Sequence, residues 1–160
     1  MCFARLFYPP IPLKGVQKEI GRLQRYKRQF TVAYVDLDNF KTVNDQFGHS
    51  KGDELLRIVA NTARNQLRDT DVVARLGGDE FALLLPETGQ EDARVVIAKI
   101  QRSFLSEMRN NGWPVTLSIG VLTCIEMPGT ADELIKMADK LMYSVKNNGK
   151  NAISESVYAG

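Results

Sequence analysis

Apolar residues recur along the chain at two different spacings, which predict helices and strands. Helical spacing first appears in residues 15–29, where Val16, Ile20 and Leu23 fall on one face of a basic amphipathic helix. Three further segments with the same spacing predict longer helices. The residues that keep this spacing are Leu55, Ile58, Val59, Thr62, Ala63 and Leu67; Val96, Ile97, Ile100 and Phe104; and Leu134, Met137, Ala138, Leu141 and Val145. Capping-box patterns predict their starts: Ser50-x-x-Asp53, Thr88-x-x-Glu91 and Thr130-x-x-Glu133.

Shorter apolar runs predict strands. We expect them over residues 31–38, 72–76, 81–85 and 115–124, with a short helical stretch over residues 40–47. The predicted order is strand, helices, hairpin, helix, strand, helix. This order is typical of an α/β, or α+β, sandwich of the ferredoxin-like type.

Two pairs of carboxylates lie at the ends of predicted strands. Asp36 and Asp38 end the first strand, and a side-chain period of two places both on one face. Asp79 and Glu80 follow two glycines in the turn of the predicted hairpin. A solvated acidic turn would explain the glycines, but it would not explain the other pair, because acids at the edge of a buried sheet are costly without compensation. The two pairs together indicate a site for metal ions.

Composition and charge narrow the class of protein. The chain has 160 residues, of which 44% are apolar, and this is enough for one sizeable core. A net charge of +2 does not favour nucleic acid or a membrane surface as partner. Cys2 and Cys124 form no ligand pattern and predict reduced thiols. Pro9, Pro10 and Pro12 interrupt any signal-like segment, and no apolar run is long enough to span a membrane, so we expect a soluble, cytoplasmic domain.

Five segments resemble, in order and spacing, the motifs of one known family. They lie between residues 30 and 153. The segments are VDLDNFKTVNDQFGH (35–49), GDELL (52–56), ARLGGDEF (74–81), SIGV (118–121) and ADKLMYSVKNNGKN (138–151). They look like the ordered motifs of the GGDEF, or diguanylate cyclase, domain. The resemblance implies a palm-like mixed β-sheet flanked by helices, of the nucleotidyl-cyclase type.

The resemblance also implies an activity and its metal ligands. A diguanylate cyclase condenses two GTP into cyclic di-GMP and two pyrophosphates, by attack of a 3′-hydroxyl on an α-phosphate. Two Mg²⁺ ions, or Mn²⁺, would neutralise the phosphate charge. The implied metal ligands are Asp36, the backbone carbonyl of Leu37, Asp79 and Glu80. Asp79 and Glu80 are also the candidate catalytic acids, and the sequence leaves open whether one of them or water removes the hydroxyl proton.

Guanine presents a ring N–H and an amine on its pairing edge, so a site selective for it needs adjacent acceptors. The family pattern assigns this recognition to Asn44 and Asp53. By residue type alone, Asp53 could equally belong to the capping box, and Asn44 could end a short helix. We expect contacts to the triphosphate from Asn39, Phe40, Lys41, Lys146 and Lys150, the first two through backbone amides. Lys150 replaces an arginine that is commoner in the family, so we expect this residue to bind the triphosphate more weakly than arginine would.

A second site is implied by Arg68 and Asp71, which form an Arg-x-x-Asp pattern five residues before Gly77. In the family this pattern resembles the allosteric site at which cyclic di-GMP inhibits its own synthesis. Arginine pairs with phosphate or guanine through two hydrogen bonds, and aspartate accepts from the guanine edge. Residue types alone favour a solvated surface pair, but the spacing favours the product site.

We assign residues 1–15 to a divergent or artificially added N-terminal segment, 16–155 to the GGDEF domain, and 156–160 to a C-terminal tail. A two-fold symmetric product requires a transient homodimer with one GTP in each subunit, and many relatives carry a sensory domain, so the chain could be the cytoplasmic domain of a larger signalling protein. The alternative is a catalytically silent receptor for GTP or cyclic di-GMP. Asn44 and Asp53 oppose a third reading, a cyclase that uses ATP.

Overall fold

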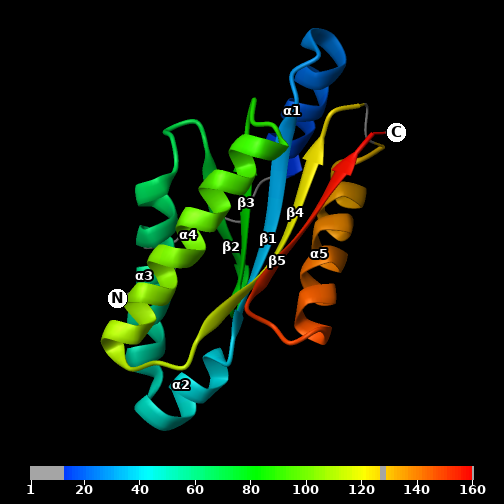
Figure 1. Ribbon diagram of the computed structural model, residues 1–160. Helices are drawn as coiled ribbons and strands as arrows, with labels where there is room; N and C mark the ends of the chain where they lie inside the picture. Colours follow the sequence, from blue (N-terminus) through cyan, green and yellow to red (C-terminus); the bar gives the residue numbers. More distant parts are fainter. Residues whose placement is uncertain (1–12, 127–128, 160) are drawn as a thin grey trace.

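The computed structural model describes residues 13–126 and 129–159, which form a five-stranded β-sheet flanked by helices (Figure 1). The elements in chain order are α1 (Leu13–Tyr26), β1 (Phe30–Asp38), α2 (Phe40–Phe47), α3 (His49–Gln66), β2 (Val72–Gly77), β3 (Glu80–Leu85), α4 (Gln90–Asn111), β4 (Thr116–Cys124), α5 (Ala131–Asn147) and β5 (Ala152–Tyr158). The four predicted strands and the predicted helices are all present. None of the helices in the described ranges is both long and apolar enough to cross a membrane.

The strand order in the sheet is β2-β3-β1-β4-β5. β1 pairs antiparallel with β3 on one side and with β4 on the other, and β2 pairs antiparallel with β3. β3 therefore lies between β1 and β2, as in a split βαβ unit. This arrangement confirms the ferredoxin-like prediction, and it puts β1 in the middle of the sheet.

β5 is an edge strand that the sequence pattern does not predict. It runs parallel to β4, with pairs from Ser118 and Ala152 to Cys124 and Tyr158. None of its residues is fully buried, so its side chains lack the apolar alternation that marks the inner strands. Pairing with β4 defines this strand, and it extends into the residues that we assigned to a C-terminal tail.

The core has two parts, one on each face of the sheet, because successive side chains of a strand point to opposite faces. On β1, Ala33, Val35 and Leu37 join the cluster that contains residues of α3 and α4. The alternate residues of β1 join the cluster that contains residues of α1 and α5. In Figure 1, α3 and α4 lie on one side of the sheet and α5 on the other. By the same alternation, Asp36 and Asp38 face the side of α5.

Only one of the three predicted capping boxes is present. The Thr130 side chain accepts a hydrogen bond from the Glu133 backbone N–H, 3.2 Å away, so this prediction is confirmed. The boxes predicted at residues 50–53 and 88–91 are wrong, because α3 and α4 start after Gly48 and Gly89 and neither has a side-chain cap. Asp53 therefore caps no helix.

α1 begins and ends earlier than predicted. We expected a helix over residues 15–29, whereas the last helical residue is Tyr26 and Lys27 adopts a positive φ of 57°. Val16, Ile20 and Leu23 are buried, as the helical spacing predicts. Most of the N-terminal segment 1–15 lies outside the described residues.

Gly120 of β4 lets α5 pack closely on the sheet. A Cβ at this position would lie 2.2 Å from the Ala138 carbonyl oxygen and 2.4 Å from the Met142 backbone nitrogen. Because both are backbone atoms, the helix itself would have to shift. We expect Gly120→Ala to lower the free energy of unfolding by roughly 1–3 kcal/mol, the usual cost of overpacking, in urea denaturation.

Gly21 provides the matched control, because a Cβ at this exposed position of α1 would meet nothing within 4 Å. We expect Gly21→Ala to stabilise the protein by up to about 1 kcal/mol through helix propensity. If both substitutions destabilised the protein equally, the close packing of α5 on Gly120 would not be the cause.

Candidate active site

The end of β1 and the turn between β2 and β3 bring together acids that are distant in sequence. Asp36 lies directly opposite Glu80 in the antiparallel register of β1 and β3. The Leu37 backbone N–H donates a hydrogen bond to the Asp79 carbonyl oxygen, 3.0 Å away. The sheet register thus places all four predicted metal-binding residues at one end of β1.

The conformation of this turn depends on its two glycines and on Arg75. Gly77 and Gly78 have backbone φ angles of 149° and 47°. Residues that carry a side chain rarely adopt such values. Nε and Nη2 of Arg75 donate to the Gly78 carbonyl oxygen at 3.0 and 2.8 Å. Sequence reasoning did not assign this role to Arg75, because it depends on the backbone path of the turn.

Asp36 is a mostly buried carboxylate with unusual electrostatics. Its side chain is 14% exposed, and its Oδ1 is buried without a hydrogen bond, with the Lys146 ammonium 3.4 Å away. Burial and then the charge of Asp79 raise the pKa of Asp36 to about 6, although the positive charge of Lys146 opposes the shift. An orphaned oxygen in an acidic environment is where a cation would be favourable.

Side chains alone do not complete a metal site at this position. Within residues 13–126 and 129–159, no three His, Cys, Asp or Glu side chains are grouped closely enough to hold a metal ion. A cation beside Asp36 therefore needs other ligands. Backbone carbonyl and nucleotide phosphate oxygens are the ligands that Mg²⁺ commonly takes besides carboxylates. The residues present fit a cation that binds together with a nucleotide.

Tyr34 forms a hydrogen bond with Glu80. Sequence reasoning did not identify this residue as part of the site. Its hydroxyl donates to Glu80 Oε2 at 2.7 Å, and the Tyr34 side chain is nearly buried. Burial, followed by the hydrogen bond and charge of Glu80, raises the pKa of the Tyr34 hydroxyl above its ordinary value, so it stays a donor. Tyr34 precedes Asp36 by two positions on the same strand face, and this spacing was the signal that could have identified it.

Asp38 is completely buried and surrounded by donors. Its Oδ1 accepts from the Ser118 hydroxyl at 2.7 Å and lies 2.8 Å from Lys146 Nζ. Its Oδ2 accepts from the Thr116 hydroxyl at 2.7 Å and the Asn151 backbone N–H at 3.1 Å. Burial alone would raise the pKa of Asp38, but Lys146 and the three hydrogen bonds outweigh it and hold the pKa below its usual range.

Lys146 thus bridges two acids in this structure. Burial by itself would lower the pKa of Lys146, but the bond to Asp38 and the charges of Asp36 and Asp38 raise it above its ordinary value. The ammonium therefore stays charged beside the proposed metal ligands.

The other residues predicted to bind phosphate lie around the start of α2. Asn39 precedes the helix in a left-handed conformation, and Phe40 is its first residue. The Asn39 side chain donates to the Pro114 carbonyl oxygen at 3.2 Å and accepts from Lys150 Nζ at 3.4 Å. Lys41 is exposed on the first turn of α2. The structure therefore groups Asn39, Phe40 and Lys150, and it holds Lys146 at the neighbouring acids.

The two residues predicted to bind guanine lie where α2 and α3 meet. A Cβ at Gly52 would lie only 1.9 Å from Asn44 Oδ1, so the amide of Asn44 packs directly on the backbone of α3. Asp53 is the next residue and is exposed. Sequence reasoning did not single out Gly52 for this close contact.

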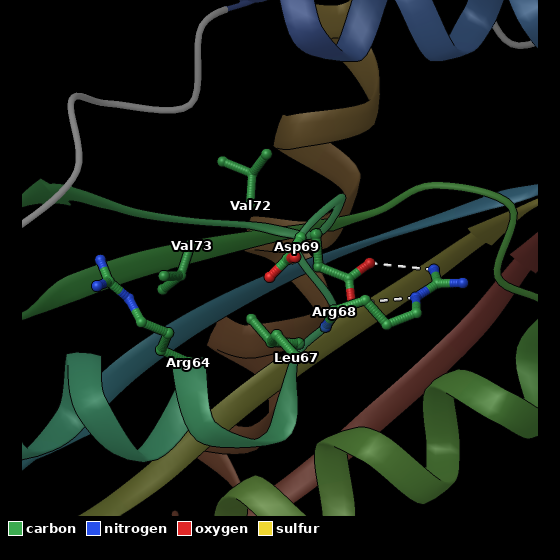
Figure 2. Close-up of a pocket in the computed structure, with 7 residues that line it drawn as sticks. Arg64, Leu67, Arg68, Asp69, Val72 and Val73 are labelled. Atoms are coloured by element: carbon green, nitrogen blue, oxygen red, sulfur yellow. Dashed lines mark hydrogen bonds and ion pairs between the residues drawn. The ribbon is translucent and has the colours of Figure 1, made fainter.

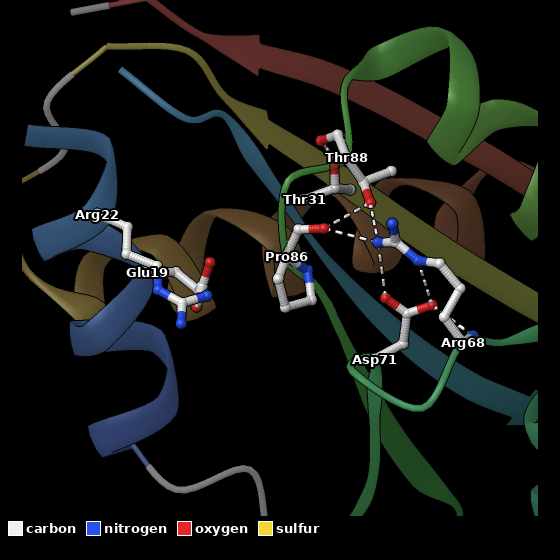
Figure 3. A network of polar contacts seen from close by, with 7 residues as sticks. All are labelled: Glu19, Arg22, Thr31, Arg68, Asp71, Pro86 and Thr88. Atoms are coloured by element: carbon white, nitrogen blue, oxygen red, sulfur yellow. Dashed lines mark hydrogen bonds and ion pairs between the residues drawn. The ribbon is translucent and has the colours of Figure 1, made fainter. Parts of the chain in front are cut away.

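The predicted product site lies at the opposite end of β1. There the Thr31 hydroxyl donates to the Thr88 carbonyl oxygen, and Arg68 Nη2 donates to the Thr88 hydroxyl at 2.8 Å and to the Pro86 carbonyl oxygen at 2.7 Å (Figure 3). Arg68 also pairs with Asp71, with Nη2 3.1 Å from Oδ1. The two predicted residues are therefore in contact.

A cavity of about 420 Å³ opens beside this pair. It is lined by Arg64, Leu67, Arg68, Asp69, Asp71, Val72 and Val73 (Figure 2). Its walls combine charged and apolar side chains, which suits a ligand with both charged and ring-shaped parts.

The chain matches the family model described as diguanylate cyclase, GGDEF domain, over residues 13–152. It belongs to this family. It is 38% identical over 138 residues to the diguanylate cyclase DgcM of Escherichia coli, and this match covers 84% of the chain and 33% of DgcM. The chain spans 21% of the length of DgcP of Pseudomonas aeruginosa and 36% of YhcK of Bacillus subtilis, so it matches only part of these curated relatives.

Solved structures share the fold. The GGDEF domain of PA1120 (YfiN or TpbB) from Pseudomonas aeruginosa superposes with a TM-score of 0.80 at 32% identity, covering 92% of this chain and 94% of that domain. A microbial GGDEF domain described in an interaction with cyclic di-GMP superposes with a TM-score of 0.76 at 29% identity, covering 89% of each chain.

The raised pKa of Asp36 predicts a pH-dependent stability. Since the folded-state pKa is about 6 against an ordinary value of 3.8, the folded protein holds this proton more tightly than the unfolded chain. The resulting stability is full below pH 3.8 and is lost as the pH rises through 6. In denaturation with EDTA present, we expect Asp36→Asn to be more stable than the parent at pH 8, by roughly 1–3 kcal/mol.

Asp45→Asn, which removes an exposed carboxylate from α2, is the control for a general change in charge. We expect the advantage of Asp36→Asn over the parent to disappear near pH 4. An advantage of the same size at pH 4 and pH 8, or none at either, would show that Asp36 carries no such strain.

Proposed function

We propose that the chain is an active diguanylate cyclase domain, which joins two GTP into cyclic di-GMP and releases two pyrophosphates. One observation carries the proposal: the turn with Asp79 and Glu80 is hydrogen-bonded to the end of β1 beside Asp36. Membership of the GGDEF family and relatives named as diguanylate cyclases support it.

The residues at this site suit two divalent cations, Mg²⁺ or Mn²⁺. Asp36, the carbonyl of Leu37, Asp79 and Glu80 would hold them, with nucleotide phosphates as further ligands. When bound, such cations neutralise the triphosphate and polarise the phosphate under attack. The hydrogen bond from Tyr34 leaves the second oxygen of Glu80 for the site. Asp79 and Glu80 are the candidate acceptors of the hydroxyl proton, with water as the alternative.

The nucleotide would lie between these acids and the contact of α2 with α3. Asn44 and Asp53 offer the adjacent acceptors that the guanine edge needs. That Asp53 caps no helix supports this role, because its structural alternative is removed. The backbone amides of Asn39 and Phe40 and the ammonium groups of Lys41, Lys146 and Lys150 supply positive charge for the triphosphate.

A single domain holds one GTP and makes a two-fold symmetric product only with a second copy. We therefore propose a transient homodimer in which each subunit presents one nucleotide to the other. In this proposal the domain works in the cytoplasm under the control of a sensory domain.

Cyclic di-GMP would also bind at Arg68 and Asp71 and inhibit the enzyme. The cavity beside this pair, and the relative described in an interaction with cyclic di-GMP, support this part of the proposal. A ligand at Arg68 would exchange the hydrogen bonds to Pro86 and Thr88 for bonds to its own phosphate or guanine.

Incubation of the chain with GTP and Mg²⁺ should yield cyclic di-GMP, detected by mass spectrometry, with a specific activity that rises with protein concentration. Asp79→Ala and Glu80→Ala should lower the rate at least 100-fold, because each removes a charged group at the reacting phosphate.

His49→Gln is the control, because it changes an exposed residue of the family motif that we give no role in catalysis. GTP binding without product at any protein concentration would refute the cyclase and favour the silent receptor.

Arg68→Ala should weaken the binding of cyclic di-GMP at least tenfold in isothermal titration, because it removes a guanidinium with charge-assisted hydrogen bonds. Arg68→Lys should recover only part of the affinity, since an ammonium lacks the two-pronged geometry. Arg102→Ala, an exposed change on α4, is the control. If the parent and Arg68→Ala bound cyclic di-GMP with equal affinity, the binding site of the product would not include Arg68.

A further inference from the structure

We infer that Asp38 is a positioning residue that holds Lys146 in place to receive the GTP triphosphate. The inference rests on the proposed function. It gives Asp38 a role that differs from metal binding and from recognition of the base. The observation behind it is that a completely buried carboxylate, 2.8 Å from Lys146 Nζ, lies at the edge of the candidate active site.

Asp38 is held more firmly than any neighbouring acid. Its four partners come from three parts of the chain: Thr116 and Ser118 on β4, Lys146 on α5, and the Asn151 backbone before β5. A buried carboxylate is tolerated only when it is compensated in this way. Asp38 is therefore a fixed point to which a flexible lysine side chain can be anchored.

Lys146 needs an anchor other than Asp36. Its ammonium lies 3.4 Å from Asp36 and 2.8 Å from Asp38, and its side chain is still 20% exposed. If a divalent cation takes the oxygens of Asp36, Asp38 is the remaining acid of the described residues that is paired with Lys146 and can keep it beside the site. An ammonium has three donors, so one bond to Asp38 leaves others for phosphate oxygens.

The contacts also indicate which part of the nucleotide is affected. Asp38 touches neither Asn44 nor Asp53 in any described contact, so its loss should leave guanine recognition intact. The effect should fall on the terminal phosphates, since Lys146 is the cation that Asp38 holds.

Asp38→Asn isolates this interaction. The amide oxygen of asparagine still accepts from Thr116 and the Asn151 backbone, and Ser118 can turn its hydroxyl to accept from the amide nitrogen. The negative charge opposite Lys146 is lost, and so is the oxygen that accepts from its ammonium, because the amide nitrogen now takes that place. Thr116→Val is the matched control, because it removes a hydrogen bond from Asp38 and leaves the ion pair with Lys146 intact.

The test compares the binding of 3′-deoxy-GTP and 3′-deoxy-GMP, which lack the attacking hydroxyl, by isothermal titration with Mg²⁺. We expect Asp38→Asn to weaken the triphosphate at least tenfold and the monophosphate less than threefold, whereas Thr116→Val leaves the ratio unchanged. Lys146→Met should reproduce the effect, and adding Asp38→Asn to it should cause no further loss, because residues that act as one unit are not additive.

Equal weakening of both nucleotides by Asp38→Asn, or further loss in the double variant, would overturn the positioning role and leave Asp38 a structural residue. If Asp38→Asn alone does not fold, comparison of the double variant with Lys146→Met still decides, since no unpaired ammonium remains there. A parent that binds 3′-deoxy-GTP but makes no cyclic di-GMP refutes the cyclase and not the role of Asp38. A parent that does not bind 3′-deoxy-GTP refutes both.

Discussion

The structure depends on compensating two carboxylates at the buried end of its central strand. Asp36 and Asp38 follow the apolar part of β1, and a charge there is costly unless a partner offsets it. Asp38 is offset by four donors, whereas Asp36 has a buried oxygen without a hydrogen bond. Asp38 is thus fully paired within the fold, and Asp36 remains available for a cation.

The position of β1 in the sheet explains why two sites can coexist. β1 pairs with β3 and β4, so its carboxyl end receives the acidic turn and the lysine of α5. Its amino end carries Thr31, which is linked through Thr88 to Arg68. β1, which has a different set of polar partners at each end, separates the candidate active site from the candidate product site.

Much of this arrangement could be predicted from local patterns. Helical spacing identified many of the buried residues of α1, α3, α4 and α5, although it missed others, such as Met108 and Met142, and the period of two placed Asp36 and Asp38 on one face. Local patterns failed where long-range contacts decide. The capping box at residues 88–91 is absent because the Thr88 hydroxyl bonds to Arg68 and Pro86. β5 was missed because an exposed edge strand is defined by its neighbour β4.

The sequence by itself determined the elements, the family motifs and the identity of the candidate ligands, because these depend on spacing within short segments. Only the tertiary structure decided which side chains complete the site. Tyr34 on Glu80, Arg75 on the Gly78 carbonyl, and Lys146 between two acids are contacts set by strand register and helix docking. Such contacts join residues far apart in the chain or follow the backbone path of a turn, so no local pattern specifies them.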